Sequence, residues 1–234
     1  RRKKFQKNLK LYQGLEADHI IHEEMITSLS PNDLVQYGIK ELNVTQFESD
    51  LDLASHVADL ILDNKIVGWY QGRGEIGPRA LGNRSILCNP GNIEIAEKLS
   101  KTVKERAAFR PYALSILKED ASEILEESPR IIEHAKWMQF VVNVKPQYIK
   151  SLRAGLHVDN TTRSHICAEE ENPLYHLLLS EIKKRIGIGA VLNTSFNASG
   201  YPMVGGESYA LSMFIKTKMD YLVLGKKVIK KSYG

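Results

Sequence analysis

Helical and strand patterns alternate along most of this chain, and the alternation restricts its fold more than any other feature of the sequence. Apolar residues recur at helical spacing over 51–63, and the short apolar run 66–70 is typical of a buried strand. Further helices are predicted at 93–103, 173–186 and 207–218, and further strands at 111–117, 137–144, 188–192 and 221–224. Such alternation indicates an α/β domain with a mixed or largely parallel sheet.

Length and composition favour a globular protein. The 234 residues suffice for one large domain with an appendage, and 43% hydrophobic with 26% charged residues argue against disorder. No run approaches the roughly 18 apolar residues of a membrane span, and Arg1–Lys4 do not begin a signal peptide. Two cysteines, Cys88 and Cys167, are too few for a disulfide scaffold or a four-thiolate zinc site. We therefore expect a cytoplasmic protein with no membrane association.

The first 50 residues carry no clear chemistry. We interpret 1–50 as a connecting segment with short helices, one of them capped by Ser30 with Pro31 at its first position. The domain itself is expected to span 51–234. The net charge of +4 is mild and includes four basic residues at positions 1–4, so the sequence shows no basic stripe for a nucleic acid.

A glycine- and arginine-rich segment follows the strand at 66–70. It runs from Gly72 to Asn89 and is read as a loop. Glycines allow the backbone to approach a ligand, and arginines present forked donors that match phosphate or carboxylate oxygens. The alternative for any one arginine is a structural salt bridge with Glu75.

Three other polar segments are candidates for the same site. The first is the segment from Lys104 to Arg110. Lys104 could also be an ordinary helix-end lysine, whose charge complements the helix dipole. The second is the cationic cluster 161–165, and the third is 193–197, which follows a buried strand, where α/β sheets bind ligands. The third could also be a plain polar turn.

Several well-known motifs are absent. The sequence has no Gly-x-x-x-x-Gly-Lys-Ser/Thr loop, no Gly-x-Gly-x-x-Gly at a helix start and no Gly-x-Ser-x-Gly elbow. His19 and His22 lie beside two glutamates, and an exposed helix face explains them better than a metal site does. His165 is expected to donate a hydrogen bond and not to bind a metal. The residues alone thus predict cationic loops that hold a phosphorylated small molecule, without identifying the reaction.

At four of these segments the chain resembles the C-terminal domain of the carbamoyltransferase family, which includes the nodulation carbamoyltransferase and antibiotic-tailoring O-carbamoyltransferases. The matching strings keep one order over about 50–225, and the first is the most specific: GRGEIGPRALGNRSIL (72–87), KERAAFRPYALSIL (104–117), TRSHI (162–166) and LNTSFNASGYPMV (192–204).

The resemblance implies a YrdC-like α/β fold, with a mixed, twisted sheet flanked by helices, related to the synthases of threonylcarbamoyl-adenylate. It implies that carbamoyl phosphate and ATP, with Mg²⁺ or another divalent cation, form carbamoyl-adenylate. In the family, an N-terminal Kae1-like domain then transfers the carbamoyl group to a hydroxyl or amine. That domain, with its metal-binding histidine motif, is not found in these residues.

The resemblance also implies roles for particular residues. Lys104, Arg163 and Ser195 would be catalytic, and no metal ligands are assigned. The substrate-binding residues would be Arg79, Arg84, Arg110, Asn193, Thr194 and Asn197. Gly74 and Tyr201 depart from the family pattern, and Tyr201 replaces an expected acidic residue.

Two alternatives remain open. The same fold could make threonylcarbamoyl-adenylate from threonine, bicarbonate and ATP. The chain could also be a noncatalytic module that binds double-stranded RNA or a nucleotide, although its mild charge and dispersed aromatics argue against nucleic acid.

Overall fold

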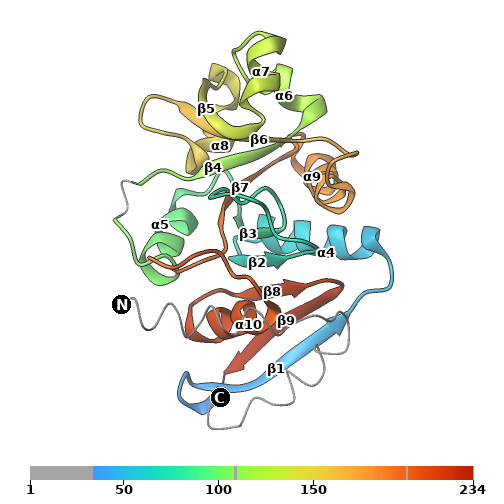
Figure 1. Cartoon of the computed structure of the whole chain (residues 1–234), viewed down its shortest axis with the longest axis vertical. Helices are drawn as coiled ribbons and strands as arrows, with labels where there is room; N and C mark the ends of the chain where they lie inside the picture. The colour runs from blue at the N-terminus through green and yellow to red at the C-terminus, as the bar shows by residue number, and fades with distance from the viewer. Residues whose placement is uncertain (1–33, 108–109, 199, 234) are drawn as a thin grey trace.

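One twisted sheet of nine strands runs through the molecule (Figure 1). The computed structural model describes residues 34–107, 110–198 and 200–233. The strand order is β1-β9-β8-β2-β3-β7-β4-β6-β5. The strands are β1 (Ile39–Gln46), β2 (Val67–Tyr70), β3 (Arg84–Cys88), β4 (Ala113–Leu117), β5 (Trp137–Asn143), β6 (Thr161–Cys167), β7 (Ala190–Ser195), β8 (Tyr221–Leu224) and β9 (Lys227–Tyr233).

The sheet is mixed. Within the described residues, β2 runs parallel to β8 and β4 parallel to β6, while the other six pairings are antiparallel. The predicted mixed α/β fold is thus confirmed, and the alternative of a largely parallel sheet is wrong. Hairpin-like connections such as β8–β9 explain the difference, because a short turn can join only antiparallel neighbours.

Helices cover both faces of the sheet (Figure 1). They pack on β-strands whose side chains alternate between the two faces: Val67 and Trp69 of β2 face a core shared with α4 and α9, whereas Tyr70 faces one shared with α5 and α10. A third core lies under α6, α7 and α8. The helices are α4 (Asp50–Leu62), α5 (Ile93–Thr102), α6 (Lys118–Ile124), α7 (Pro129–Ala135), α8 (Pro146–Leu152), α9 (Pro173–Ile186) and α10 (Glu207–Lys216), with the 3₁₀ turn η1 (Arg153–Gly155).

Local signals explain the longest predicted helices. Ser49 caps α4 by accepting hydrogen bonds from two backbone amides of the first turn. In α9, Asn172 is the N-cap, Pro173 follows at the first position, and Gly187 ends the helix with φ +77°. None of the helices in the described part of the chain is long and apolar enough to cross a bilayer.

Three strands lie where the sequence analysis placed polar loops. β3 occupies the end of the expected loop 72–89, β6 contains the cluster 161–165, and β7 extends through Ser195. All three are interior strands of the sheet, so each is paired on both sides by neighbouring strands. The strand pattern was missed because arginine, serine and asparagine at these positions interrupt the apolar alternation.

The expected connecting segment also contains a strand. Residues 39–46 form β1, which pairs antiparallel with β9 along its length, so this part of 1–50 belongs to the same sheet as the rest of the domain. Most of its side chains are exposed on both faces, which leaves no two-residue alternation to detect. The predicted helix cap at Ser30 and the histidines at 19 and 22 lie outside the described residues.

Candidate functional site

A cavity of about 440 Å³ lies where four segments of the chain meet. They are the loop between β2 and β3, the connection from α5 to β4, the start of β6 with the loop before it, and the end of β7; Met138, near the start of β5, adds to the lining. Of the nine predicted site residues, six line this cavity: Arg79, Arg110, Arg163, Asn193, Thr194 and Ser195. Segments far apart in the sequence therefore present their polar groups to one space.

The cavity wall is strongly cationic. Arg106 joins the three predicted arginines in the lining, and the lining contains no carboxylate. Partial burial, together with the nearby charge of Arg163, lowers the pKa of Arg79. Like charges so close together are stabilised by a multiply charged anion, because it neutralises them without a conformational change.

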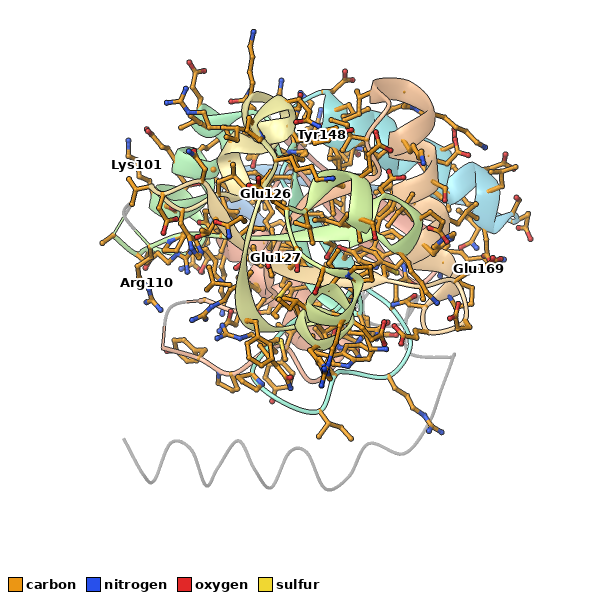
Figure 2. The ribbon with its side chains drawn as sticks, turned by 90° about the horizontal axis from the view of Figure 1, so that it is seen from above. Lys101, Arg110, Glu126, Glu127, Tyr148 and Glu169 are labelled. Carbon is orange, nitrogen blue, oxygen red and sulfur yellow. The ribbon has the colours of Figure 1, made fainter. Side chains whose placement is uncertain are left out.

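Arg110 lies at the outer margin of the cavity. Its side chain is exposed at the edge of the molecule, on the side opposite to Glu169 (Figure 2). Arg106 is held more firmly: its guanidinium lies 4.3 Å from the centre of the Tyr112 ring and donates to the carbonyls of Arg110 and Pro111. Within the described residues, no hydrogen bond or ring contact holds the Arg110 head group, whereas Arg106 has both.

Lys104 lies directly behind Ser195. Its side chain is 5% exposed, and its ammonium donates to the carbonyl oxygens of Ser195 at 2.7 Å and Asn197 at 2.9 Å, and to Asn197 Oδ1 at 2.6 Å. Burial and, to a smaller extent, the charges of Arg106 and Arg110 together lower the pKa of Lys104 to about 7. Lys104 therefore changes its charge near neutral pH, in contact with the strand end that carries Ser195.

Asn197 fixes the turn after β7. Its Oδ1 accepts from the Ser195 hydroxyl at 2.6 Å as well as from Lys104, and its Nδ2 donates to the Tyr201 carbonyl at 2.6 Å. Asn197 does not line the cavity. The predicted substrate-binding residue is in this geometry a partner that orients Ser195.

Arg84 is the predicted site residue that the structure turns away from the cavity. It is 5% exposed, its guanidinium lies 3.6 Å from the centre of the Tyr70 ring, and it donates to the carbonyls of Gln71 at 2.6 Å and Gly72 at 2.9 Å. Because β3 pairs antiparallel with β2, Arg84 faces Tyr70 and the start of the loop. Its donors hold the backbone of this loop and do not face the cavity.

The β2–β3 loop is organised by Glu75, although not by a salt bridge of the expected kind. One Glu75 oxygen accepts from the backbone amides of Leu81 at 2.7 Å, Asn83 at 2.8 Å and Arg84 at 3.2 Å. Gly82 lies in this nest with φ +95°, and a Cβ there would lie 2.4 Å from the Tyr175 ring. The glycine-rich string therefore shapes the loop that carries Arg79.

Among the other lining residues, Arg106, Met138 and His157 are not predicted site residues. Arg106 lies within the matching string 104–117 without an assigned role, and Met138 and His157 give no local signal in the sequence. Met138 has φ +58° in an irregular part of β5, where β5 and β6 lose register. His157 accepts or donates a 2.9 Å hydrogen bond with Thr161 Oγ1. Irregular backbone of this kind leaves no periodic trace in a sequence.

A larger and more open hollow of about 700 Å³ lies elsewhere, against the start of α5 and the end of α8. None of the predicted site residues lines it. Its amides are already used: Asn89 bonds to Gly91 and Asn64, and Asn92 caps α5. We therefore place the candidate site in the smaller, cationic cavity.

Solved structures define the class of the fold. The chain resembles full-length HypF in its phosphate- and nucleotide-bound form, with TM-score 0.53 and 19% identity over 74% of this chain and 25% of that one. It also resembles P. abyssi Sua5 complexed with L-threonine, with TM-score 0.54 and 16% identity over 76% of this chain and 48% of that one. The likeness confirms the expected YrdC-like fold and, at these identities, nothing beyond the fold.

Sequence comparison gives the family. Residues 58–231 match the model described as Carbamoyltransferase C-terminus, and the chain belongs to this family through that domain. It is 40% identical over 195 residues to nodulation protein NolO of Bradyrhizobium diazoefficiens, covering 82% of this chain and 35% of that protein. It is 35% identical over 136 residues to the 3'-hydroxymethylcephem-O-carbamoyltransferase of Amycolatopsis lactamdurans, covering 58% of this chain and 25% of that protein. The chain thus spans about a quarter to a third of these relatives.

Proposed function

We propose that this domain makes carbamoyl-adenylate from carbamoyl phosphate and ATP, as one part of a carbamoyltransferase. One observation carries the proposal: four arginines, Asn193 and Ser195 line a single cavity without a carboxylate in its wall. Two reactants that together carry many negative charges repel each other unless cations neutralise them. Family membership supports the carbamoyl group as the one that is transferred.

The proposed reaction has two balanced steps. Water first adds to the carbamoyl carbon, and the bond from this carbon to the phosphate oxygen breaks. Inorganic phosphate leaves as H₂PO₄⁻ with both protons of the water, so that the carbamate anion remains. A carbamate oxygen then attacks the α-phosphorus of ATP, and the bond to the β-phosphate bridge breaks to release pyrophosphate. Free carbamate decomposes in water, so a wall that keeps it in place favours the second step.

The chain's own residues have distinct parts in this proposal. Arg79 and Arg163 bind the phosphate of carbamoyl phosphate and the phosphate that it releases, and Arg110 binds an outer phosphate of ATP. Thr194, Ser195 and Asn193 donate to or accept from the carbamate. Lys104 and Asn197 orient Ser195 from behind, and the charge of Lys104 stabilises anions in the cavity. Arg84 has no part in the reaction in this proposal, and it holds the backbone of the β2–β3 loop.

Within the described residues, the cavity wall offers no carboxylate ligand to a divalent cation. Mg²⁺ prefers carboxylate oxygens, and the cavity lining holds none. Within the described residues, no three histidine, cysteine, aspartate or glutamate side chains cluster to hold a metal. The donor set therefore does not fit a resident metal, and no step above passes through one.

Transfer to the final acceptor is assigned to another part of a longer protein. The curated relatives are about three to four times as long as the matched segment, so their full activity involves residues that this chain does not match. We propose a Kae1-like N-terminal domain as the partner that accepts carbamoyl-adenylate, in the cytoplasm, where ATP is available.

The test is release of pyrophosphate from ATP by the purified chain. We expect release that depends on carbamoyl phosphate, and a loss of about 100-fold or more in Arg163→Ala, since a cation aimed at developing charge contributes about that much. Arg153→Ala is the matched control: this exposed arginine lines the other hollow, and its replacement should leave the rate within about twofold.

Other outcomes would contradict the proposal. Release that requires threonine and bicarbonate would indicate threonylcarbamoyl-adenylate synthesis. Tight, steeply salt-dependent RNA binding without turnover would indicate a binding module. An unchanged rate in Arg163→Ala would reject the role assigned to that residue.

A further inference from the structure

The amide of Asn193 is held in one orientation at the cavity wall. The residue is 1% exposed, and its Nδ2 donates to the carbonyl of Ala80 at 2.9 Å and to Ser115 Oγ at 2.8 Å. A backbone carbonyl can only accept, so the atom that faces Ala80 must be the nitrogen. Oδ1 therefore points away from the Ala80 carbonyl. It is a buried atom at the cavity wall, and among the described residues it has no hydrogen-bond partner.

A buried chain of side chains supports this orientation from behind. Ser115 is fully buried, and its Oγ lies 3.0 Å from Nδ1 of His165, which is 2% exposed. The imidazole lies between two rings, with centroids 5.9 Å from Tyr175 at 13° and 6.3 Å from Trp137 at 22°. Ring and hydroxyl are thus fixed by packing as well as by hydrogen bonds.

The protonation states of Asn193, Ser115 and His165 follow from their surroundings. Burial lowers the pKa of His165 to about 4, so the ring is neutral at pH 7 and one ring nitrogen is an acceptor. Ser115 Oγ accepts from Asn193, and its own hydrogen is then free to donate to Nδ1 of His165. Both Nδ2 hydrogens of Asn193 and the Ser115 hydroxyl hydrogen then have acceptors, and within the described residues Asn193 Oδ1 is left as an acceptor without a donor.

We propose that Ser115 and His165 are positioning residues that keep Asn193 Oδ1 as an unpaired acceptor in the wall of the cavity, and that this acceptor selects acyl phosphates bearing an N–H next to the carbonyl. The inference rests on the proposed function, because carbamoyl phosphate carries such an amino group. Acetyl phosphate has nearly the same shape, with a methyl group in its place. A buried acceptor that meets a methyl group stays unpaired, and this penalty is the source of selectivity.

The experiment compares carbamoyl phosphate with acetyl phosphate by calorimetric titration of the purified chain without ATP. We expect the unmodified protein to bind carbamoyl phosphate about tenfold more tightly, or better. In Ser115→Ala an Nδ2 hydrogen loses its acceptor, and the amide is held by the Ala80 carbonyl alone. In His165→Phe the stack is kept, but the hydroxyl loses its acceptor. In both, the preference should fall to about threefold or less.

The matched control is Ser164→Ala. Ser164 is the neighbour of His165 on β6, and its buried hydroxyl makes no hydrogen bond within the described residues, so its removal should leave the preference unchanged. Loss of stability alone would weaken both ligands equally and would not change their ratio. If Ser115→Ala does not fold, Ser115→Cys keeps the side-chain volume with a weaker acceptor and carries the same expectation.

The outcomes separate this inference from the function on which it rests. If the unmodified protein does not bind carbamoyl phosphate, the proposed function and the inference both fail. If it binds both acyl phosphates equally well, or if Ser115→Ala and His165→Phe keep the full preference, only the inference fails.

Discussion

Arg79 and Arg84 lie close together in the sequence but have different surroundings in this domain. Arg79 faces the cavity, while Arg84, five positions later, donates to the carbonyls of Gln71 and Gly72. Burial lowers the pKa of both side chains, so electrostatics alone does not tell them apart. The difference lies in what surrounds each guanidinium: solvent and other cations for Arg79, backbone oxygens and the Tyr70 ring for Arg84.

This division gives a prediction for the two residues. Arg84→Lys should lower the free energy of unfolding by about 2–3 kcal/mol, because a lysine cannot reach both carbonyls while it stacks on Tyr70. Arg79→Lys should change stability by less than about 0.5 kcal/mol. Urea unfolding of both variants measures the difference, and equal effects would contradict the structural role of Arg84.

The loop between β2 and β3 acts as one element that presents Arg79. Glu75 gathers three backbone amides of the loop, and Gly82 packs its backbone against the Tyr175 ring of α9. The Gly82 carbonyl also accepts from Trp69 Nε1 at 2.8 Å. The loop is thereby tied to the sheet and to a helix on one face.

A side chain at position 82 should disrupt this element. Gly82→Ala introduces a Cβ 2.4 Å from the Tyr175 ring at a backbone φ of +95°, and we expect a loss of about 3 kcal/mol in stability, with weaker binding of anions in the cavity. The control is Gly74→Ala in the same loop, where the nearest atom to a new Cβ is 3.7 Å away.

Thermal unfolding with and without inorganic phosphate tests this pair. Gly74→Ala should keep both the melting temperature and its increase on adding phosphate. If Gly82→Ala behaves like Gly74→Ala, the packing of the loop on Tyr175 does not control its conformation.

Buried titrating groups on different elements set how the stability of the whole molecule depends on pH. Burial lowers the pKa of Lys104 to about 7 and that of Lys231 to about 8, whereas it raises the pKa of Cys167 to about 12 and that of Cys88 further. A lysine with a depressed pKa keeps its proton more readily in the unfolded chain. A thiol with a raised pKa does the opposite.

Stability should therefore rise between about pH 7 and pH 8.5. In this window the unfolded chain, with lysine pKa values near 10.4, binds more protons than the native state, and each extra proton gives about 1.4 kcal/mol per pH unit. We expect a slope of about 1 kcal/mol per pH unit. Above about pH 8.5 unfolded cysteines lose protons that the buried thiols retain, so the rise should stop.

Urea unfolding in phosphate-free buffers across this window measures the slope. Lys104→Met removes the larger of the two lysine effects, so its slope should be clearly smaller. Lys101→Met, at an exposed position near the end of the preceding helix α5, should behave like the unmodified chain. The same slope in Lys104→Met would show that Lys104 titrates normally.

Local patterns in the sequence determined much of the domain. Helical spacing, Asn172 with Pro173 and the αL residue Gly187 suffice for α9, because capping and periodicity act within a few residues. The residue types of the site, arginines beside glycines and hydroxyls at a strand end, likewise indicated an anion site before any geometry was known.

Only the tertiary structure decided which of those residues share the site. β1 pairs with β9 from the other end of the chain, and β3, β6 and β7 have polar sequences that become strands because their neighbours satisfy their backbone groups. The direction of β3 turns Arg84 to the carbonyls, and burial gives Lys104 its low pKa. Strand pairing and burial depend on contacts between distant residues, and no local pattern encodes such contacts.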